Sequence, residues 1–259
     1  MPGILTNVTT IRLTLAYDGT GFRGWAAQRD PALRTVEGSL TVVLTEAMGE
    51  RVKLAVAGRT DARVHARGQV ASFITSSDRD PAAVRDAING RLAPEIVALD
   101  VRRVPDAFHA RFSASAREYR YRVNMGRVPD PFDAAFVWHH ACDPDLGAMR
   151  SAAQHMVGDH DFTSFCRHPG PGKPTVRDLQ RVAVHRRGDR LELTFRANAF
   201  LHQMVRSLAG TLVAVGEDAV APDSIPAILR ARDRARAKHL APPHGLTLER
   251  VIYGPRQGR

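Results

Sequence analysis

The stretch VKLAVAGRTDARVHARGQVASFI, residues 52–74, decides the order of the elements around it. Its two ends, VKLAVA at 52–57 and QVASFI at 69–74, are runs of mainly apolar residues that predict two consecutive β-strands. Further out, IRLTLAY at 11–17 alternates apolar with other residues, which is also typical of a strand, and IVALDVRRV at 96–104 is predicted as a further strand. We therefore expect four strands, with the quoted stretch supplying the middle two.

Two helices are expected between these strands. Apolar residues recur at helical spacing from Val36 to Ala47, and Gly49 follows as a stop signal. The segment DPAAVRDAINGRL begins with Asp80 as a plausible N-cap and Pro81 at the first helical position. The predicted order is β-α-β-β-α-β, which is the ferredoxin-like order.

The second half of the chain repeats this order in its pattern of residues. Strands are predicted at 118–124, 178–186, 190–197 and 246–253, and helices at 145–157, 200–216 and, as a short addition, 224–232. We therefore predict an α+β protein with two domains, residues 1–106 and 107–259, joined near 105–116.

Composition points to a polyanionic partner. The 259 residues carry a formal net charge of +10, and Lys53, Lys173 and Lys238 are the only lysines. Arginine suits bidentate phosphate contacts and stacking on bases, so nucleic acid is the favoured partner. No apolar run approaches the ~20 residues of a membrane span, and the first residues do not resemble a signal peptide. Cys142 and Cys166 imply neither a disulfide framework nor a zinc finger. We expect a cytoplasmic protein without a membrane segment.

The acidic residue inside the basic loop needs an explanation. Arg59, Arg63 and Arg67 surround Asp61, and His65 lies close by. Asp61 could cap a turn or pair with Arg59, or it could bind a metal together with His65. It could also be a nucleophile that the neighbouring arginines keep ionised. The residues alone leave these three interpretations open, although no carboxylate-rich segment accompanies the metal alternative.

AGRTDARVHARGQV resembles the signature GRTDAGVHA of the tRNA pseudouridine synthase A family. The likeness continues through YDGTGFRGW at 17–25, FHARFSASAREYRYRV at 108–123, DFTSF at 161–165 and ANAFLHQMVRSLAG at 197–210. The resemblance implies two ferredoxin-like halves whose antiparallel sheets join, with a basic cleft between them, and a homodimer. It implies an enzyme that converts uridine to pseudouridine in the tRNA anticodon stem-loop, at tRNA positions 38, 39 and 40. It further implies an essential Asp and no cofactor.

Residue roles follow from the resemblance by position. Asp61 matches the catalytic Asp, and Arg59 matches the signature Arg, which would fill the space of the flipped base or contact RNA. Tyr119 matches the active-site Tyr, suited to stacking on the uracil, although core packing is the alternative for it and for Tyr121. Arg206 matches the basic residue expected to pair with the nucleophile. Addition to uracil and attack at the anomeric carbon of the sugar both remain open for Asp61.

Position 63 departs from the signature, because Arg63 stands where the family has glycine. We predict an ordinary φ there, so that the Arg63 side chain reaches a substrate phosphate. A positive φ would instead strain the loop and favour an RNA-binding protein without catalytic activity. His65 and Arg67 are predicted to bind substrate as well. A metal-dependent nuclease is the third function considered, and we expect no metal.

Overall fold

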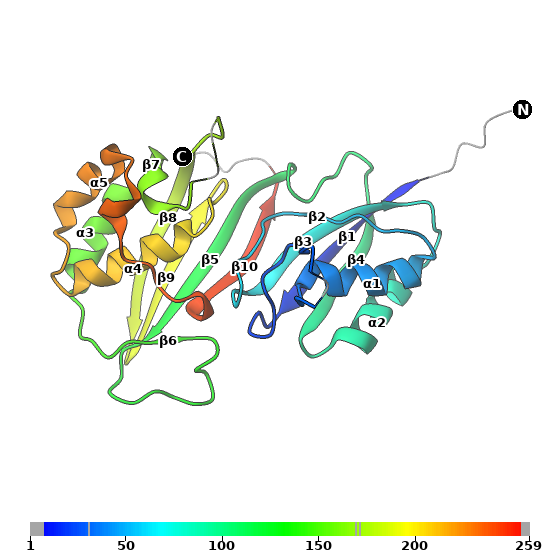
Figure 1. Cartoon of the computed structure of the whole chain (residues 1–259), viewed down its shortest axis with the longest axis horizontal. Helices are drawn as coiled ribbons and strands as arrows, with labels where there is room; N and C mark the ends of the chain where they lie inside the picture. Colours follow the sequence, from blue (N-terminus) through cyan, green and yellow to red (C-terminus); the bar gives the residue numbers. More distant parts are fainter. Residues whose placement is uncertain (1–7, 31, 169, 171, 255–259) are drawn as a thin grey trace, which may run out of the picture. The chain divides into compact units, whose positions relative to one another are not determined.

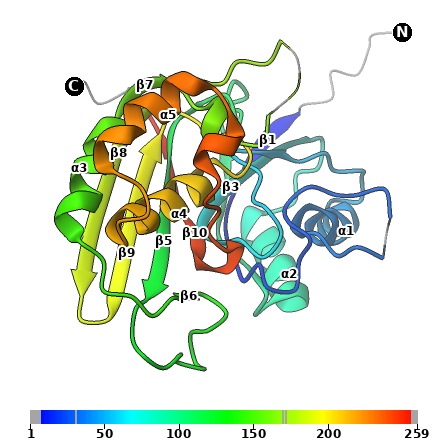
Figure 2. The same ribbon diagram turned by 60° about the vertical axis from the view of Figure 1, so that its left-hand side comes forward.

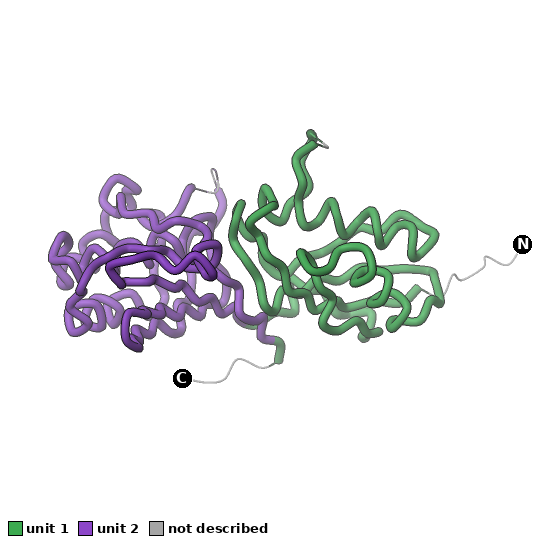
Figure 3. Tube along the Cα trace, turned by 90° about the horizontal axis from the view of Figure 1, so that it is seen from below, with its two compact units in different colours: residues 1–115, 253–259 green, residues 116–252 purple. Residues whose placement is uncertain are grey.

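The computed structural model describes residues 8–30, 32–168, 170 and 172–254. The chain divides into two compact units, residues 1–115 with 253–259 and residues 116–252 (Figure 3). The sequence places the boundary earlier, between residues 106 and 107. Residues 107–115 belong instead with the first unit, because the N–H of Ala110 donates to Oγ of Ser72 over 3.1 Å. The hydroxyl of Tyr253 also donates to the carbonyl of Ala110 over 2.7 Å.

The first unit has the predicted β-α-β-β-α-β order. Its elements are β1 (Thr9–Tyr17), α1 (Val36–Met48), β2 (Ala55–Val56), β3 (His65–Thr75), α2 (Pro81–Leu92) and β4 (Ile96–Val104). The strands lie in the order β4-β1-β3, β2 pairs with β3, and all of these pairs are antiparallel. Helix α2 packs on β4 and on α1 (Figure 1).

Both helices of this unit begin and end where the sequence predicts. The side chain of Thr35 accepts a hydrogen bond from the N–H of Gly38 at the start of α1, and Gly49 ends that helix with φ +70°. The side chain of Asp80 accepts from the N–H of Ala82, and Pro81 opens α2. These caps satisfy backbone groups that a helix end leaves without partners.

The second unit contains more elements than predicted. They are β5 (Ala114–Asn124), β6 (Trp138–His139), α3 (Leu146–Met156), β7 (Gly158–Asp161), β8 (Val176–Arg187), β9 (Arg190–Ala197), α4 (Met204–Gly216), α5 (Ile225–Ala231) and β10 (Leu246–Tyr253). Four short 3-10 helices among the described residues are η1 (Thr163–Phe165), η2 (Pro222–Ser224), η3 (Arg234–Ala237) and η4 (Pro243–Gly245). Strands β6 and β7 were not predicted, because they are only two and four residues long.

The strands of this unit lie in the order β10-β5-β9-β8-β7, with β6 parallel to β5. The pairs β5–β9, β9–β8 and β8–β7 are antiparallel. Figures 1 and 2 show α4 running across the sheet, and α3 packs against α4 and β8. The fold is mixed α+β with mostly antiparallel strands, as the sequence predicts.

Helix α4 begins four residues later than the predicted 200–216. Gln203, directly before it, has φ +63°, which lies outside the range of a right-handed helix. Almost every residue of α4 is buried, including Leu208 and Leu212. Within the part of the chain that the structure describes, no helix combines the length and the apolar character that a membrane span needs.

Candidate functional site

Asp61 opens a tight turn between β2 and β3 of the first unit. The N–H of Val64 donates to the carbonyl of Asp61 over 3.2 Å, and Ala62 and Arg63 are the two central residues. Asp61 itself is partly buried. A rigid sheet on both sides of a short loop is a suitable support for a reactive side chain.

The prediction of an ordinary φ at Arg63 is wrong, because the structure gives φ +65°. A positive φ at the third residue of a four-residue turn is what a type II turn requires, and glycine or asparagine is usual there. For arginine this conformation costs on the order of 1 kcal/mol or more. The turn that carries Asp61 is therefore strained at its third residue.

The turn is fixed in this shape by the segment DGTGFRGW, residues 18–25, which lies against its backbone. A Cβ atom added to Gly19 would lie 2.2 Å from the carbonyl oxygen of Val64. One added to Gly24, whose φ is +96°, would lie 2.9 Å from the carbonyl oxygen of Thr60. The N–H of Trp25 also donates to that oxygen over 3.0 Å. Two glycines thus permit a backbone contact that leaves the Asp61 turn little room to move.

A buried polar cluster holds the residues just before Asp61. The hydroxyls of Tyr17 and Thr60 lie 2.8 Å apart, and Nε2 of Gln69 donates to the Tyr17 oxygen over 3.3 Å. The same amide donates to the carbonyl of Gly58 over 2.7 Å. Burial raises the pKa of Tyr17 to about 12, although its bonds to Thr60 and Gln69 oppose that shift. Tyr17 is therefore neutral at physiological pH and serves as an anchor.

His65, which the sequence predicts to bind substrate, is buried in the structure. His65 is only 3% exposed, so its ring is shielded from a ligand. Its Nδ1 accepts a hydrogen bond from the N–H of Gly19 over 3.0 Å and lies 3.1 Å from a carboxylate oxygen of Asp18. Asp18 in turn accepts from the N–H and the hydroxyl of Thr20, so it forms a turn. His65 therefore supports the segment 18–25 through its contacts with Gly19 and Asp18.

The three arginines around Asp61 are all exposed. No ion pair joins Arg59, Arg63 or Arg67 to an acidic residue within the described ranges 8–30, 32–168, 170 and 172–254. Their positive charges are therefore not neutralised by the part of the protein that the structure describes.

Tyr119 and Arg206, the other two predicted catalytic residues, belong to the second unit, whereas Asp61 belongs to the first. Tyr119 lies on β5, is 6% exposed and meets the ring of Phe200 edge to face at 5.2 Å between centroids. Tyr121, two residues on, is fully buried, and its hydroxyl donates to the carbonyl of Pro242 over 2.7 Å. The core role considered for Tyr121 is thereby confirmed.

Arg206 lies in the first turn of α4 and is partly buried. Its Nε donates to the carbonyl of Ala241 over 2.9 Å, and the N–H of Ala241 donates back to the carbonyl of Arg206 over 3.1 Å. These two hydrogen bonds hold Arg206, including the Nε end of its side chain, against Ala241, in the segment just before η4.

Several residues that shape the Asp61 turn were not singled out by the sequence. They are Tyr17, Gly19, Gly24 and Gln69. Most of their contacts are to residues more than thirty positions away, and the contact of Gln69 with Gly58 spans 11 positions, so no local pattern predicts them. The glycines in DGTGFRGW, which include Gly19 and Gly24, are the one signal in that segment that indicates a close backbone approach.

Among the described residues, His140, Cys142 and Glu217 place donor atoms that could hold a metal ion within 4.8 Å of one another. However, Nε2 of His140 is already engaged with Glu217 at 2.8 Å. Burial raises the pKa of the Cys142 thiol, and the neighbouring Glu217 and Asp143 add to this effect. The His140–Glu217 hydrogen bond joins this group to the C-terminal end of α4.

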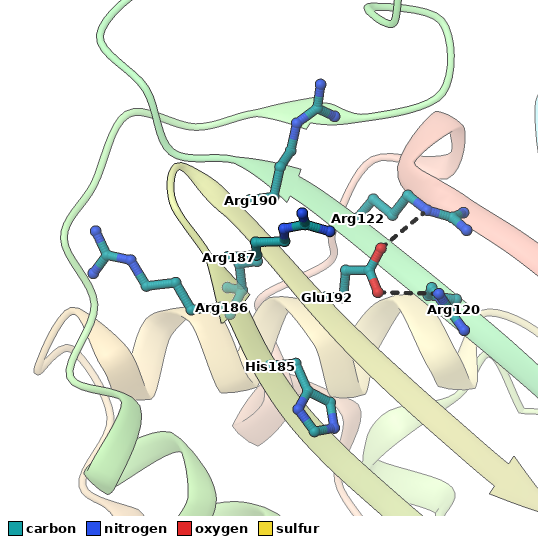
Figure 4. Close-up of a pocket in the computed structure, with 8 residues that line it drawn as sticks. Arg120, Arg122, His185, Arg186, Arg187, Arg190 and Glu192 are labelled. Carbon is teal, nitrogen blue, oxygen red and sulfur yellow. Dashed lines mark hydrogen bonds and ion pairs between the residues drawn. The ribbon is translucent and has the colours of Figure 1, made fainter.

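A second cluster of arginines lines a hollow of about 600 Å³ on the second unit (Figure 4). The lining residues are Arg120, Arg122, His185, Arg186, Arg187, Arg190, Leu191 and Glu192. Figure 4 shows Glu192 bridging Arg120 at 3.0 Å and Arg122 at 3.6 Å. Arg122 also pairs with Glu249, Arg186 with Asp143, and Arg190 with Asp133. Most of these arginines are therefore neutralised within the fold.

Comparison with known proteins gives matches along most of the chain. A protein-family model described as tRNA pseudouridine synthase matches residues 14–113 and 152–254. The proteins named tRNA pseudouridine synthase A of Moorella thermoacetica and Brevibacillus brevis are each 41% identical to this chain over 243 residues, which covers 94% of this chain and 99% of theirs. That of Brucella ovis is 41% identical over 245 residues, covering 93% of this chain and 97% of its own. Among solved structures, the crystal structure of an archaeal box H/ACA sRNP Nop10-Cbf5 complex is similar at a TM-score of 0.34 with 10% identity, over 78% of this chain and 44% of that one. That likeness is too weak to add to the sequence matches.

Proposed function

The chain belongs to the tRNA pseudouridine synthase family, an RNA-modifying class of isomerases, and on that premise we propose that it converts uridine to pseudouridine in the tRNA anticodon stem-loop, at tRNA positions 38, 39 and 40, with Asp61 as nucleophile. The proposal rests mainly on the 41% identity, over 94% of this chain, to the tRNA pseudouridine synthase A of Moorella thermoacetica. The turn geometry supports it, because a single carboxylate stands at the head of a clamped turn among exposed arginines.

The carboxylate of Asp61 has two chemical routes to this reaction. It can add to the uracil ring, or it can attack the anomeric carbon of the sugar, and each route breaks the bond between base and sugar. Either route requires the target nucleotide to leave its stack, at a cost of a few kcal/mol. Binding of the flanking RNA strand must offset that cost, and this is the role we assign to Arg59, Arg63 and Arg67.

Tyr119 and Arg206 complete the proposed catalytic group. Tyr119 stacks on the flipped uracil, since an aromatic ring binds any base face. Arg206 pairs with the Asp61 carboxylate and keeps it ionised, since an opposite charge nearby lowers the pKa of an acid. Asp61 and Arg206 lie within the residues matched by the family model, whereas Tyr119 lies in the gap between the matched segments.

The family resemblance also supports a wider arrangement. We propose that the two units are ferredoxin-like halves with joined sheets and a basic cleft that receives the RNA. The working form is proposed to be a homodimer in the cytoplasm, without a cofactor.

The test is incubation with an unmodified tRNA transcript, followed by mapping of pseudouridine. We expect the modification in the anticodon arm, formed without added cofactor and unaffected by EDTA. Asp61→Asn is expected to abolish it while tRNA affinity changes little, because the substitution removes a nucleophile and no phosphate contact.

Comparable turnover by Asp61→Asn would exclude the nucleophile assignment. RNA cleavage that EDTA prevents would favour a nuclease. Tight tRNA binding with no pseudouridine would favour a non-catalytic RNA-binding protein, a function that the strained φ of Arg63 also favours.

A further inference from the structure

Arg63 combines an unfavourable backbone conformation with a side chain that the fold does not use. Its φ is +65°, at the turn position where glycine is the usual residue. Its backbone N–H donates to the carbonyl of Phe22 over 3.3 Å, and glycine would keep that bond. Among the residues that the structure describes, the guanidinium takes part in no hydrogen bond, ion pair or ring contact. Glycine would therefore meet the backbone requirement at lower cost, and the arginine side chain adds no contact to the described part of the fold.

The surroundings of Arg63 define the chemistry of that ligand. Segment 18–25 covers part of the turn backbone, while the Arg63 side chain is exposed, two residues after the carboxylate of Asp61. Arg59 and Arg67 are exposed on either side of it, so positive charge exceeds negative charge around the turn. A guanidinium binds a phosphate group through parallel N–H···O bonds, which gives direction as well as attraction.

We propose that Arg63 binds a backbone phosphate of the RNA next to the uridine that is presented to Asp61. This inference rests on the proposed function, and it gives the strained turn a purpose. The protein keeps arginine at a position that prefers glycine because the side chain holds the substrate strand beside the nucleophile. Arginine at position 63 therefore lowers the stability of the protein and raises its affinity for tRNA.

The test is a comparison of Arg63→Gly with Arg63→Lys in the full-length protein. Arg63→Gly is expected to raise the midpoint of thermal unfolding by roughly 2–4 °C, because it relieves the strain at positive φ. The same variant is expected to weaken tRNA binding by about threefold to tenfold and to flatten the log–log salt dependence by roughly 0.7–0.9, the contribution of one phosphate. Its kcat/KM should fall with the affinity. Arg63→Lys keeps both the charge and the positive φ, so it should unfold like the wild type and keep most of the salt dependence.

Asp218→Gly is a matched control. Asp218 also has a positive φ, +60°, and an exposed side chain. This variant should gain thermal stability and keep its tRNA affinity. An Arg63→Gly protein with wild-type affinity and salt dependence would overturn the inference, and so would a variant with raised turnover. Pseudouridine formation by the wild type is measured alongside: if it occurs, such results reject only the phosphate contact. If it does not occur but Arg63→Gly still binds tRNA more weakly, the contact stands and the proposed reaction falls.

Discussion

Two arginine-rich regions of this protein look alike in sequence and differ in structure. Residues 59–67 in the first unit and residues 185–192 in the second each carry several arginines and one or two acids. In the first region no ion pair joins Arg59, Arg63 or Arg67 to an acid within the described part of the chain. In the second, Arg186 pairs with Asp143 at 2.6 Å, and Glu192 bridges two further arginines (Figure 4).

The difference shows that the density of positive charge does not identify a phosphate-binding surface. An arginine already paired with a carboxylate must lose that partner before it can bind phosphate, so its net gain is small. An exposed arginine without such a partner releases counterions from the nucleic acid at no comparable cost. The hollow on the second unit is therefore a poorer candidate for RNA binding than the surface around Asp61, although it holds more arginines.

The largest effect is expected from Gly19→Ala, next to the first region, with Gly188→Ala in the second region as its control. Gly19→Ala places a Cβ 2.2 Å from the Val64 carbonyl oxygen, so the turn that carries Asp61 must move. We expect kcat to fall about 100-fold or more, since a displacement of about 1 Å near the chemistry has that effect. Gly188→Ala, in the β8–β9 turn, meets nothing within 4 Å and has φ +58°, so it should cost on the order of 1 kcal/mol of stability and no activity. Single-turnover rates of both variants measure the loss of activity, and thermal unfolding measures the loss of stability. A normal rate for a folded Gly19→Ala protein would show that the contact does not position the nucleophile.

Alkaline pH is expected to weaken the anchor behind Asp61. The folded-state pKa of Tyr17, about 12, lies above the unfolded value of 10.0 because the ring is buried. The stabilisation by the neutral phenol is therefore complete below pH 10 and is lost as the pH rises toward 12, by about 2–3 kcal/mol in total. Tyr17→Phe should lack this contribution to the pH dependence. Urea unfolding of both proteins between pH 9 and 11.5 tests it, and parallel stability curves would contradict it.

Much of the fold was predictable because it depends on local signals. The N-caps at Thr35 and Asp80 and the stop at Gly49 lie within a few residues of the helices they delimit. Strands β4 and β9 have the predicted bounds, and the residues of β9 alternate regularly between partly exposed and buried. Strand β7, with the sequence GDHD, carries no such alternation and depends on its pairing with β8.

The site was less predictable, because its shape comes from contacts between distant segments. The positive φ of Arg63 follows from a turn that Gly19 and Gly24 hold from outside, and the identity of residue 63 argues against it. The buried ring of His65 accepts a hydrogen bond from Gly19, which lies 46 residues away in the sequence. The resemblance singles out Asp61 as the proposed catalytic residue, but it does not predict the burial or the backbone conformation of the residues around it.

Two tyrosines on β5 sharpen the distinction between a substrate contact and a fold contact. Tyr119→Leu is expected to weaken tRNA binding by about 1–3 kcal/mol through the loss of base stacking, whereas Tyr119→Phe keeps the ring and should slow turnover only. Tyr121→Phe loses the buried hydrogen bond to Pro242 and should cost about 1 kcal/mol of stability with unchanged binding. Binding isotherms measure the effect on tRNA affinity, and urea unfolding measures the effect on stability. If all three substitutions had equally small effects on tRNA binding, Tyr119 would be assigned to the core rather than to the substrate.

The smallest expected effect tests the opening comparison directly, by removing one arginine from each region. Arg67→Ala should flatten the log–log salt dependence of tRNA binding by roughly 0.7–0.9, because one phosphate contact is lost. Arg186→Ala should leave that slope as it is, since Arg186 is held by Asp143 at 2.6 Å. The loss of this pair should lower stability by less than about 1 kcal/mol, because Asp143 is 84% exposed and solvent screens the pair. Affinities measured at several salt concentrations decide between the regions. A slope that changes with Arg186→Ala and not with Arg67→Ala would place the RNA on the hollow of the second unit and reverse the comparison.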